Sequence, residues 1–243
     1  MLFQTMYREI KKKKLILENR KPYKIEAVNL MNEINTTDWI YSSLRLDGIG
    51  LSKTSVERII KGDIIADISI SNHVAVGSYI EAIKELYAMA DMSIYLNEKY
   101  LFKLYQILAK PQVPEYRKSN PVLLMLSYNP PHFKEIGEQM QLLFHWLHSD
   151  RQQSNPIEKA AFLHNKIIEI YPFETHTEAI ARMTAQYHLI CSGFPPILWN
   201  INEQEYYDAT RIYLKKEDIR PIYDVLERGV FNKLEIMMQL TAE

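Results

Sequence analysis

The scarcity of glycine and proline is the feature that most restricts the fold of this chain. Only 7 glycines and 11 prolines occur among 243 residues, and apolar residues recur at helical spacing over long stretches. Because glycine and proline are the residues that most often interrupt helices, we expect a mostly α fold with short connections. None of the glycines forms a phosphate-loop or dinucleotide-binding pattern.

End signals divide the chain into expected helices. Ser52 is predicted to cap a helix from Lys53 to Ile60, and Asn155-Pro156 starts a helix that runs to about Ile170. Residues 116–126 are the one candidate β-hairpin, although its returning run is too short to be told from a helical turn. The other expected helices cover residues 25–34, 39–46, 76–90, 97–109, 134–148, 175–192, 203–214 and 219–238.

Composition excludes several classes of protein. The chain has 47% hydrophobic residues, and 29 basic against 30 acidic residues give a net charge of -1, so it lacks the positive field of a non-specific nucleic-acid binder. No stretch is apolar enough to span a membrane, and the lysines near the start precede no apolar signal segment. Cys191 is the single cysteine, which excludes an intramolecular disulfide. These features predict one cytoplasmic domain over residues 1–243.

The junction between two expected helices carries the most information. Residues 171–182 read Tyr-Pro-Phe-Glu-Thr-His-Thr-Glu-Ala-Ile-Ala-Arg, with His164 before them and Gly193-Phe194-Pro195-Pro196 after them. This arrangement resembles the core of the Fic (Fido-domain) family, whose signature is His-Pro-Phe-x-Asp/Glu-Gly-Asn-Gly-Arg-x-x-Arg. The resemblance implies a Fic-type helical bundle with its core at about 76–200.

The resemblance also implies a chemistry. In the family, the histidine takes a proton from a hydroxyl of a target protein, and that hydroxyl attacks the α-phosphate of ATP. The acidic residue holds Mg, the Gly-Asn-Gly turn cradles phosphates, and the arginines meet the β- and γ-phosphates. A relative with this machinery transfers AMP to a protein.

Two other segments extend the resemblance. Residues 43–48, Ser-Leu-Arg-Leu-Asp-Gly, look like the family's inhibitory-helix motif Ser/Thr-x-x-x-Glu-Gly/Asn, within a segment at about 36–50. There the acid bridges to the last signature arginine, which implies a pair between Asp47 and Arg182; alternatively, Arg182 lies on a solvated helix face. Arg117, Lys118 and Ser119 stand where the family has its target-docking flap.

The signature is degenerate at the positions that carry the chemistry. Tyr171 replaces the histidine, and a phenol with an ordinary pKa near 10 is a poor base at neutral pH. Thr175 replaces the Mg-binding acid. The remaining replacements are His176, Thr177 and Glu178 for Gly-Asn-Gly, and Ala179 for the first arginine.

The replaced residues change the expected ligands. Thr175 and Glu178 have the spacing of a capping box, which would satisfy the backbone N–H groups that phosphate needs. We therefore expect no cofactor and no metal site, with ATP and Mg bound only if the family activity survives. His164 is expected to form a hydrogen bond in the core.

Three functions remain open from the sequence. The first is a catalytically silent regulatory or signalling protein that acts by binding a protein partner, with a homodimer also possible in such a family. The second is a transferase of AMP or a related group that uses Tyr171 or His176 near the reaction centre. The third is a DNA-binding regulator through Ser52 to Ile60, although the neutral net charge argues against a nucleic-acid partner.

Overall fold

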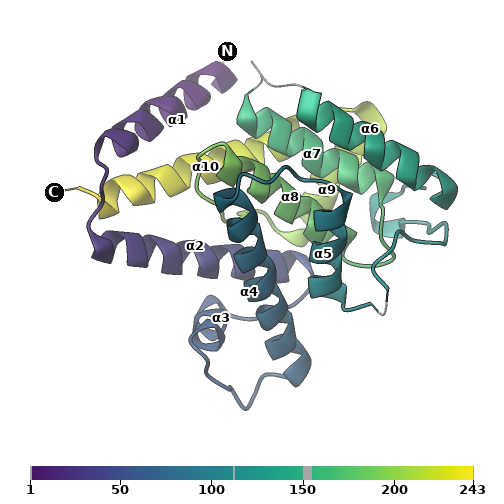
Figure 1. The fold of residues 1–243 in the computed structure, drawn as a ribbon, viewed down its shortest axis with the longest axis horizontal. Coiled ribbons are helices and arrows are strands. Elements are labelled where there is room, and N and C mark those ends of the chain that lie inside the picture. Colours follow the sequence, from purple (N-terminus) through teal and green to yellow (C-terminus); the bar gives the residue numbers. More distant parts are fainter. Residues whose placement is uncertain (1, 112, 150–154, 243) are drawn as a thin grey trace.

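The mostly α fold is confirmed. The computed structural model describes residues 2–111, 113–149 and 155–242, and within them the chain forms α-helices, two short 3-10 helices and no strand (Figure 1). The helices are α1 (Leu2–Asn19), α2 (Ile25–Leu46), α3 (Lys53–Ile60), α4 (Ile70–Asp91), α5 (Glu98–Ala109), α6 (Ile136–Ser149), α7 (Pro156–Ile170), α8 (Thr177–Cys191), α9 (Glu203–Lys216) and α10 (Arg220–Leu240), with η1 (Leu124–Leu126) and η2 (Phe133–Glu135) between α5 and α6.

Helices α7 and α8 pack against each other and contribute to both hydrophobic cores. One core joins them to α2, α4, α5 and α6, and includes the fully buried Trp39. The other joins them to α1, α9 and α10, and includes the fully buried Trp199. The loop between α7 and α8 is therefore held from two sides.

The end signals read from the sequence hold at several helices. Ser52 caps α3 by accepting a hydrogen bond from the Ser55 N–H at 3.0 Å, and Asn155 caps α7 with Pro156 in its first turn. Helix α2 ends before Gly48, whose φ of 77° is the left-handed geometry that glycine adopts readily. The prediction of two helices over 25–46 is wrong, because α2 is continuous.

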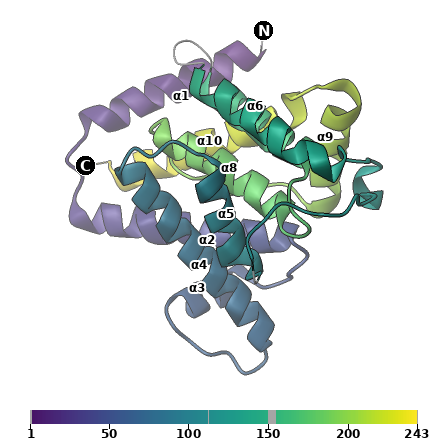
Figure 2. The same ribbon diagram turned by 45° about the vertical axis from the view of Figure 1, so that its right-hand side comes forward.

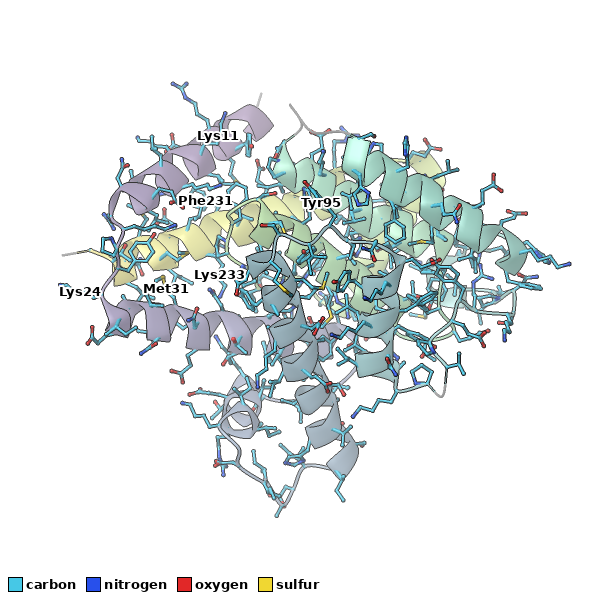
Figure 3. All side chains as sticks on the ribbon, viewed as in Figure 1. Lys11, Lys24, Met31, Tyr95, Phe231 and Lys233 are labelled. Carbon is cyan, nitrogen blue, oxygen red and sulfur yellow. The ribbon has the colours of Figure 1, made fainter. Side chains whose placement is uncertain are left out.

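A buried ion pair explains why α2 continues through its polar middle. The Lys233 ammonium of α10 donates to the Asp38 carboxylate of α2 at 2.6 Å, and both side chains are buried. Figure 3 shows Lys233 between these two helices. Lys53 of α3 adds a second ion pair to Asp38 at 2.6 Å. Asp38 therefore ties three helices together, because a carboxylate out of water requires such partners.

Helix α1 is absent from the sequence-based prediction. It packs on α10 with Ile10 and Leu17 buried, while Lys13 pairs with Glu235 and Lys14 donates to the Ser192 carbonyl at 2.6 Å. The lysine run obscured this helix, because the aliphatic stems of lysines cover apolar surface while their ammonium groups reach polar partners.

The predicted β-hairpin is wrong within the described residues. The run expected as a returning strand turns into η1, and only an isolated bridge joins Leu123 to Tyr128. Leu124 is 81% exposed, whereas Leu126 is 2% exposed and packs in the core, so the run is a turn anchored by one end rather than a strand of a hairpin. Ser127 closes the turn with a φ of 49°.

Two glycines in helices test the packing. A Cβ at Gly229 of α10 would lie 2.9 Å from the Cβ of Ile197, whereas a Cβ at Gly77 of α4 would meet nothing within 4 Å. We expect Gly229→Ala to lower the free energy of unfolding by about 1–3 kcal/mol through overpacking. Gly77→Ala is the matched control and should raise it by about 0.5–1 kcal/mol. Urea denaturation measures both, and equal effects would contradict this packing.

Candidate functional site

The loop between α7 and α8 is anchored by its aromatic residues. Tyr171 ends α7 in the left-handed conformation with a φ of 49°, and its N–H donates to the Ile167 carbonyl at 2.9 Å. Phe173 is fully buried and stacks on Tyr105 of α5 with ring centroids 4.2 Å apart. Because stacked aromatic pairs resist displacement, the backbone of this loop is fixed relative to α5.

The predicted capping box at the start of α8 is not formed. The helix begins at Thr177, after His176 in the left-handed conformation with a φ of 62°, and no side chain caps it. The Thr177 hydroxyl instead accepts from the Phe173 N–H at 3.1 Å and donates to the Phe173 carbonyl at 3.2 Å. The left-handed turn at His176 delays the helix by two residues, so Thr175 is exposed and pairs only with the His176 ring.

Tyr171 and Glu178 form a hydrogen bond across the front of this turn. The Tyr171 hydroxyl donates to a Glu178 carboxylate oxygen at 2.9 Å. Burial, and then the charge of Glu178, raise the pKa of Tyr171 far above its usual value. The phenol therefore stays protonated at neutral pH and acts as a hydrogen-bond donor.

Arg182 forms a buried ion pair with Asp47. Arg182 is fully buried on α8, and its guanidinium bonds to the Asp47 carboxylate that follows α2. The Tyr79 hydroxyl of α4 donates to the other Asp47 oxygen at 2.5 Å. Burial alone would lower the pKa of Arg182, but the charge of Asp47 raises it well above its usual value. The alternative that Arg182 lies on a solvated helix face is wrong.

A polar chain continues from Arg182 into the core. The Arg182 guanidinium lies over the Tyr206 ring at 5.4 Å, and the Tyr206 hydroxyl lies 2.8 Å from Nε2 of His164. Nδ1 of His164 lies 3.0 Å from the Asn165 side-chain oxygen. The expected core hydrogen bond of His164 is thus present, and burial lowers the pKa of this residue to about 3.

Arg117 is buried, which corrects the expectation that it lies on an open docking edge. Its guanidinium donates to the carbonyls of Tyr171 at 2.7 Å, Ser119 at 2.5 Å and Pro131 at 2.5 Å. The backbone N–H of Arg117 donates to the Pro172 carbonyl at 2.9 Å. Five guanidinium donors in one plane suit such a cluster of carbonyls. Arg117 therefore joins the flap segment to the signature loop.

Glu174 joins the same two segments from the other side. Its carboxylate accepts from the backbone N–H groups of Lys118 at 3.0 Å and Ser119 at 3.2 Å, and from the Ser119 hydroxyl at 2.8 Å. Burial opposes the ionised form of Glu174, but these hydrogen bonds outweigh it and lower its pKa. Two backbone donors of the flap segment are thus already paired.

A cavity of about 560 Å³ lies beside the signature loop. It is bounded by the ends of α2 and α5, one face of α4, and the first turns of α8 and α9. Among the site residues predicted from sequence, those that line it are Asp47, Thr175, His176, Glu178 and Ala179.

Other predicted site residues lie outside the cavity lining. Tyr171, Thr177 and Arg182 do not line it, nor do Arg117, Lys118 and Ser119. Four charged or aromatic lining residues were not anticipated because no sequence motif places α4, α5 and α9 beside the loop: Tyr79, Lys110, Glu203 and Tyr207.

Helix α3 has its basic residues paired. Lys53 pairs with Asp38 at 2.6 Å, and Arg58 pairs with Asp63 at 2.8 Å. Lys61, which follows the helix, lies 2.6 Å from Glu33. Because phosphate contacts need cationic side chains, this pairing does not favour α3 as a DNA-reading helix.

The described part of the chain contains neither a metal-binding cluster nor a membrane-spanning helix. No group of three His, Cys, Asp or Glu residues within it is arranged to hold a metal ion. No helix among the described residues is long and apolar enough to cross a membrane.

The fold is similar to that of solved Fic-domain proteins. It superposes on a Fic domain containing signaling protein from Bacteroides thetaiotaomicron with a TM-score of 0.85, 21% identity, and coverage of 96% of this chain and 97% of that one. It also superposes on Fic-1 from Caenorhabditis elegans with a TM-score of 0.83, 18% identity, and coverage of 97% and 72%.

Sequence comparison gives the same resemblance. Residues 95–189 match the profile of the Fic/DOC family. A protein adenylyltransferase Fic from Drosophila mojavensis is 22% identical over 210 residues, which are 84% of this chain and 41% of the relative. One from Nematostella vectensis is 33% identical over 100 residues, or 41% and 23% of the two chains. The chain thus spans about two fifths of the Drosophila relative's length.

The buried histidines predict a pH dependence of stability. Burial lowers the pKa of His164 to about 3 and that of His188 to about 4, below the value near 6.5 of an unfolded chain. Their neutral forms stabilise the fold fully above pH 6.5, and this contribution is lost as the pH falls, by about 1.4 kcal/mol per pH unit for each histidine. Denaturation from pH 6.5 to 4.5 should show a shallower slope for His164→Gln. The exposed His145→Gln is the control, and an unchanged slope in His164→Gln would contradict the assignment.

The Asp47–Arg182 pair predicts a large cost of neutralisation. Asp47→Asn should lower the free energy of unfolding by about 3 kcal/mol, because it leaves a fully buried guanidinium without its counter-charge. Asp63→Asn removes the partner of the exposed Arg58 and should cost at most about 1 kcal/mol. Urea denaturation measures both variants, and similar costs would show that the buried pair is unimportant.

Proposed function

We propose that this protein is a Fic-type regulatory protein that does not transfer AMP and acts by binding another protein. The observation that carries the proposal is the hydrogen bond from Tyr171 to Glu178. It occupies the positions at which the family signature has its base and the last glycine of its phosphate loop. The Tyr171 hydroxyl and one carboxylate oxygen of Glu178 are thereby paired with each other.

Proton transfer lacks a suitable base at this site. A general base must be deprotonated near the working pH, whereas burial and Glu178 keep the Tyr171 phenol protonated. His176 is exposed and its Nδ1 pairs with the Thr175 hydroxyl at 3.0 Å. Within the described residues no carboxylate bonds to the His176 ring, which gives a role as a substitute base no support.

The residues at the start of α8 do not fit Mg and ATP. Glu178 places a carboxylate in the first helical turn, where a phosphate would otherwise meet backbone N–H groups and the positive end of the helix. Thr175 lacks the charge of the Mg-binding acid, and Ala179 has no guanidinium. Arg182 is the one charged signature residue that remains, and it is bound to Asp47. We derive no step through ATP.

Protein binding is the function that survives these losses. The similar chains are called protein adenylyltransferases, so the scaffold is one that meets other proteins. In this chain the flap is fixed by Arg117 and Glu174, which supports a rigid contact surface. We place the protein in the cytoplasm and treat residues 1–243 as a single domain, in keeping with one cysteine and the absence of a linker in the sequence.

Calorimetric titration with ATP and Mg tests the loss of nucleotide binding. The native protein should release no binding heat, which places any dissociation constant above about 1 mM. Glu178→Gly should bind at least about tenfold more tightly, because it removes a carboxylate and opens the first turn of α8. Thermal unfolding verifies that the variant is folded.

The control for that titration is a matched change of charge. Glu138→Gln removes one exposed carboxylate from α6, which does not line the cavity, and should leave ATP binding absent. Micromolar binding of ATP by the native protein would overturn the proposal.

A further inference from the structure

The cavity beside the signature loop is lined by carboxylates that form no ion pair with a described residue. Glu178 and Glu203 line it, and neither forms an ion pair among the described residues. Asp47 also lines it, but its charge is balanced by Arg182. Lys110 is the one lysine or arginine in the lining. A ligand with positive charge is therefore favoured over an anion, because Coulomb attraction strengthens where water is partly excluded.

An unpartnered hydroxyl gives a second, independent indication of a ligand. Ser78 of α4 lines the cavity and is only 5% exposed, yet its hydroxyl makes no hydrogen bond within the described chain. The Ser78 oxygen is open to the cavity rather than sealed from it, so it is available to hydrogen-bond a polar group that enters. Tyr207 lines the same cavity and supplies an aromatic ring, a group that attracts cations.

The outer rim of the cavity is apolar. Ile70 and Val74 lie one turn apart on α4 and are 84% and 45% exposed, and Val74 also lines the cavity. Figure 2 shows this first part of α4 projecting with α3 at one end of the molecule. The apolar ridge of Ile70 and Val74 thus continues directly into the acidic cavity.

We propose that the cavity receives an arginine or lysine side chain of a partner protein, while apolar residues beside that side chain pack on the ridge. This inference rests on the proposed function, because it specifies how the partner is bound. Charge complementarity comes from Glu178 and Glu203, and the hydroxyl of Ser78 accepts a hydrogen bond from the cationic group. The volume of about 560 Å³ accommodates such a side chain.

Two isosteric probes test the charge requirement. Butylguanidinium and N-butylurea have nearly the same shape, but only the first carries a charge. In NMR titrations of the full chain, butylguanidinium should bind at least about tenfold more tightly, and Glu203→Gln should weaken it roughly threefold to tenfold. Glu138→Gln is the control and should change nothing. Equal affinity for the two probes would overturn the proposal.

A peptide tests whether the ligand belongs to a protein. Acetyl-Leu-Arg-Leu-amide should bind at least about tenfold more tightly than butylguanidinium, since its leucines add apolar contact on the ridge. Ile70→Ser should remove most of this advantage while leaving butylguanidinium binding unchanged. A peptide no tighter than butylguanidinium would overturn the docking of a protein segment.

The outcome is separable from that of the nucleotide titration. A native protein that binds ATP overturns the proposed function, whatever the cationic probes do. A native protein that binds neither ATP nor butylguanidinium leaves the non-catalytic function standing and overturns the cationic site.

Discussion

The buried pair between Arg182 and Asp47 is the contact on which the arrangement of this molecule depends. A guanidinium that is fully removed from water requires a counter-charge, and Asp47 supplies it from the end of α2. This requirement fixes α8 against α2, and the hydroxyl of Tyr79 brings α4 to the same carboxylate. Three of the helices that contribute to the walls of the cavity, α2, α4 and α8, thus meet at this contact.

The signature loop is held in place by contacts with the core and with the flap segment. Phe173 is still anchored in the core, and Arg117 and Glu174 attach the flap segment to the loop. The hydrogen bond between Tyr171 and Glu178 lies on this rigid frame. Because function resides in the site rather than in the fold, the proposed function rests on these contacts and not on the similarity of the scaffold.

The sequence predicted most helices because their end signals are local. Ser52, and Asn155 with Pro156, act within one turn of the helix that they start. The error at Arg117 concerns long-range contacts. The burial of Arg117 depends on carbonyls from two distant segments, and nothing near Arg117 in the sequence announces them.

The site shows the same division between local and distant information. The pairing of Arg182 with Asp47 followed from the family resemblance, whereas the roles of Tyr79 and Glu203 require the fold. The predicted capping box does not form. Glu178 accepts a hydrogen bond from Tyr171 instead, and the left-handed conformation of His176 places the helix start at Thr177. Spacing alone cannot choose between two partners for one carboxylate.

The most direct test of the account is the transfer of label from ATP labelled at the α-phosphate, with Mg, to proteins. The native chain should label neither itself nor added proteins above the level of a control with EDTA in place of Mg, because the proposal leaves it without a base and a phosphate site. Covalent labelling of a protein hydroxyl by the native chain, absent in that control, would contradict the account.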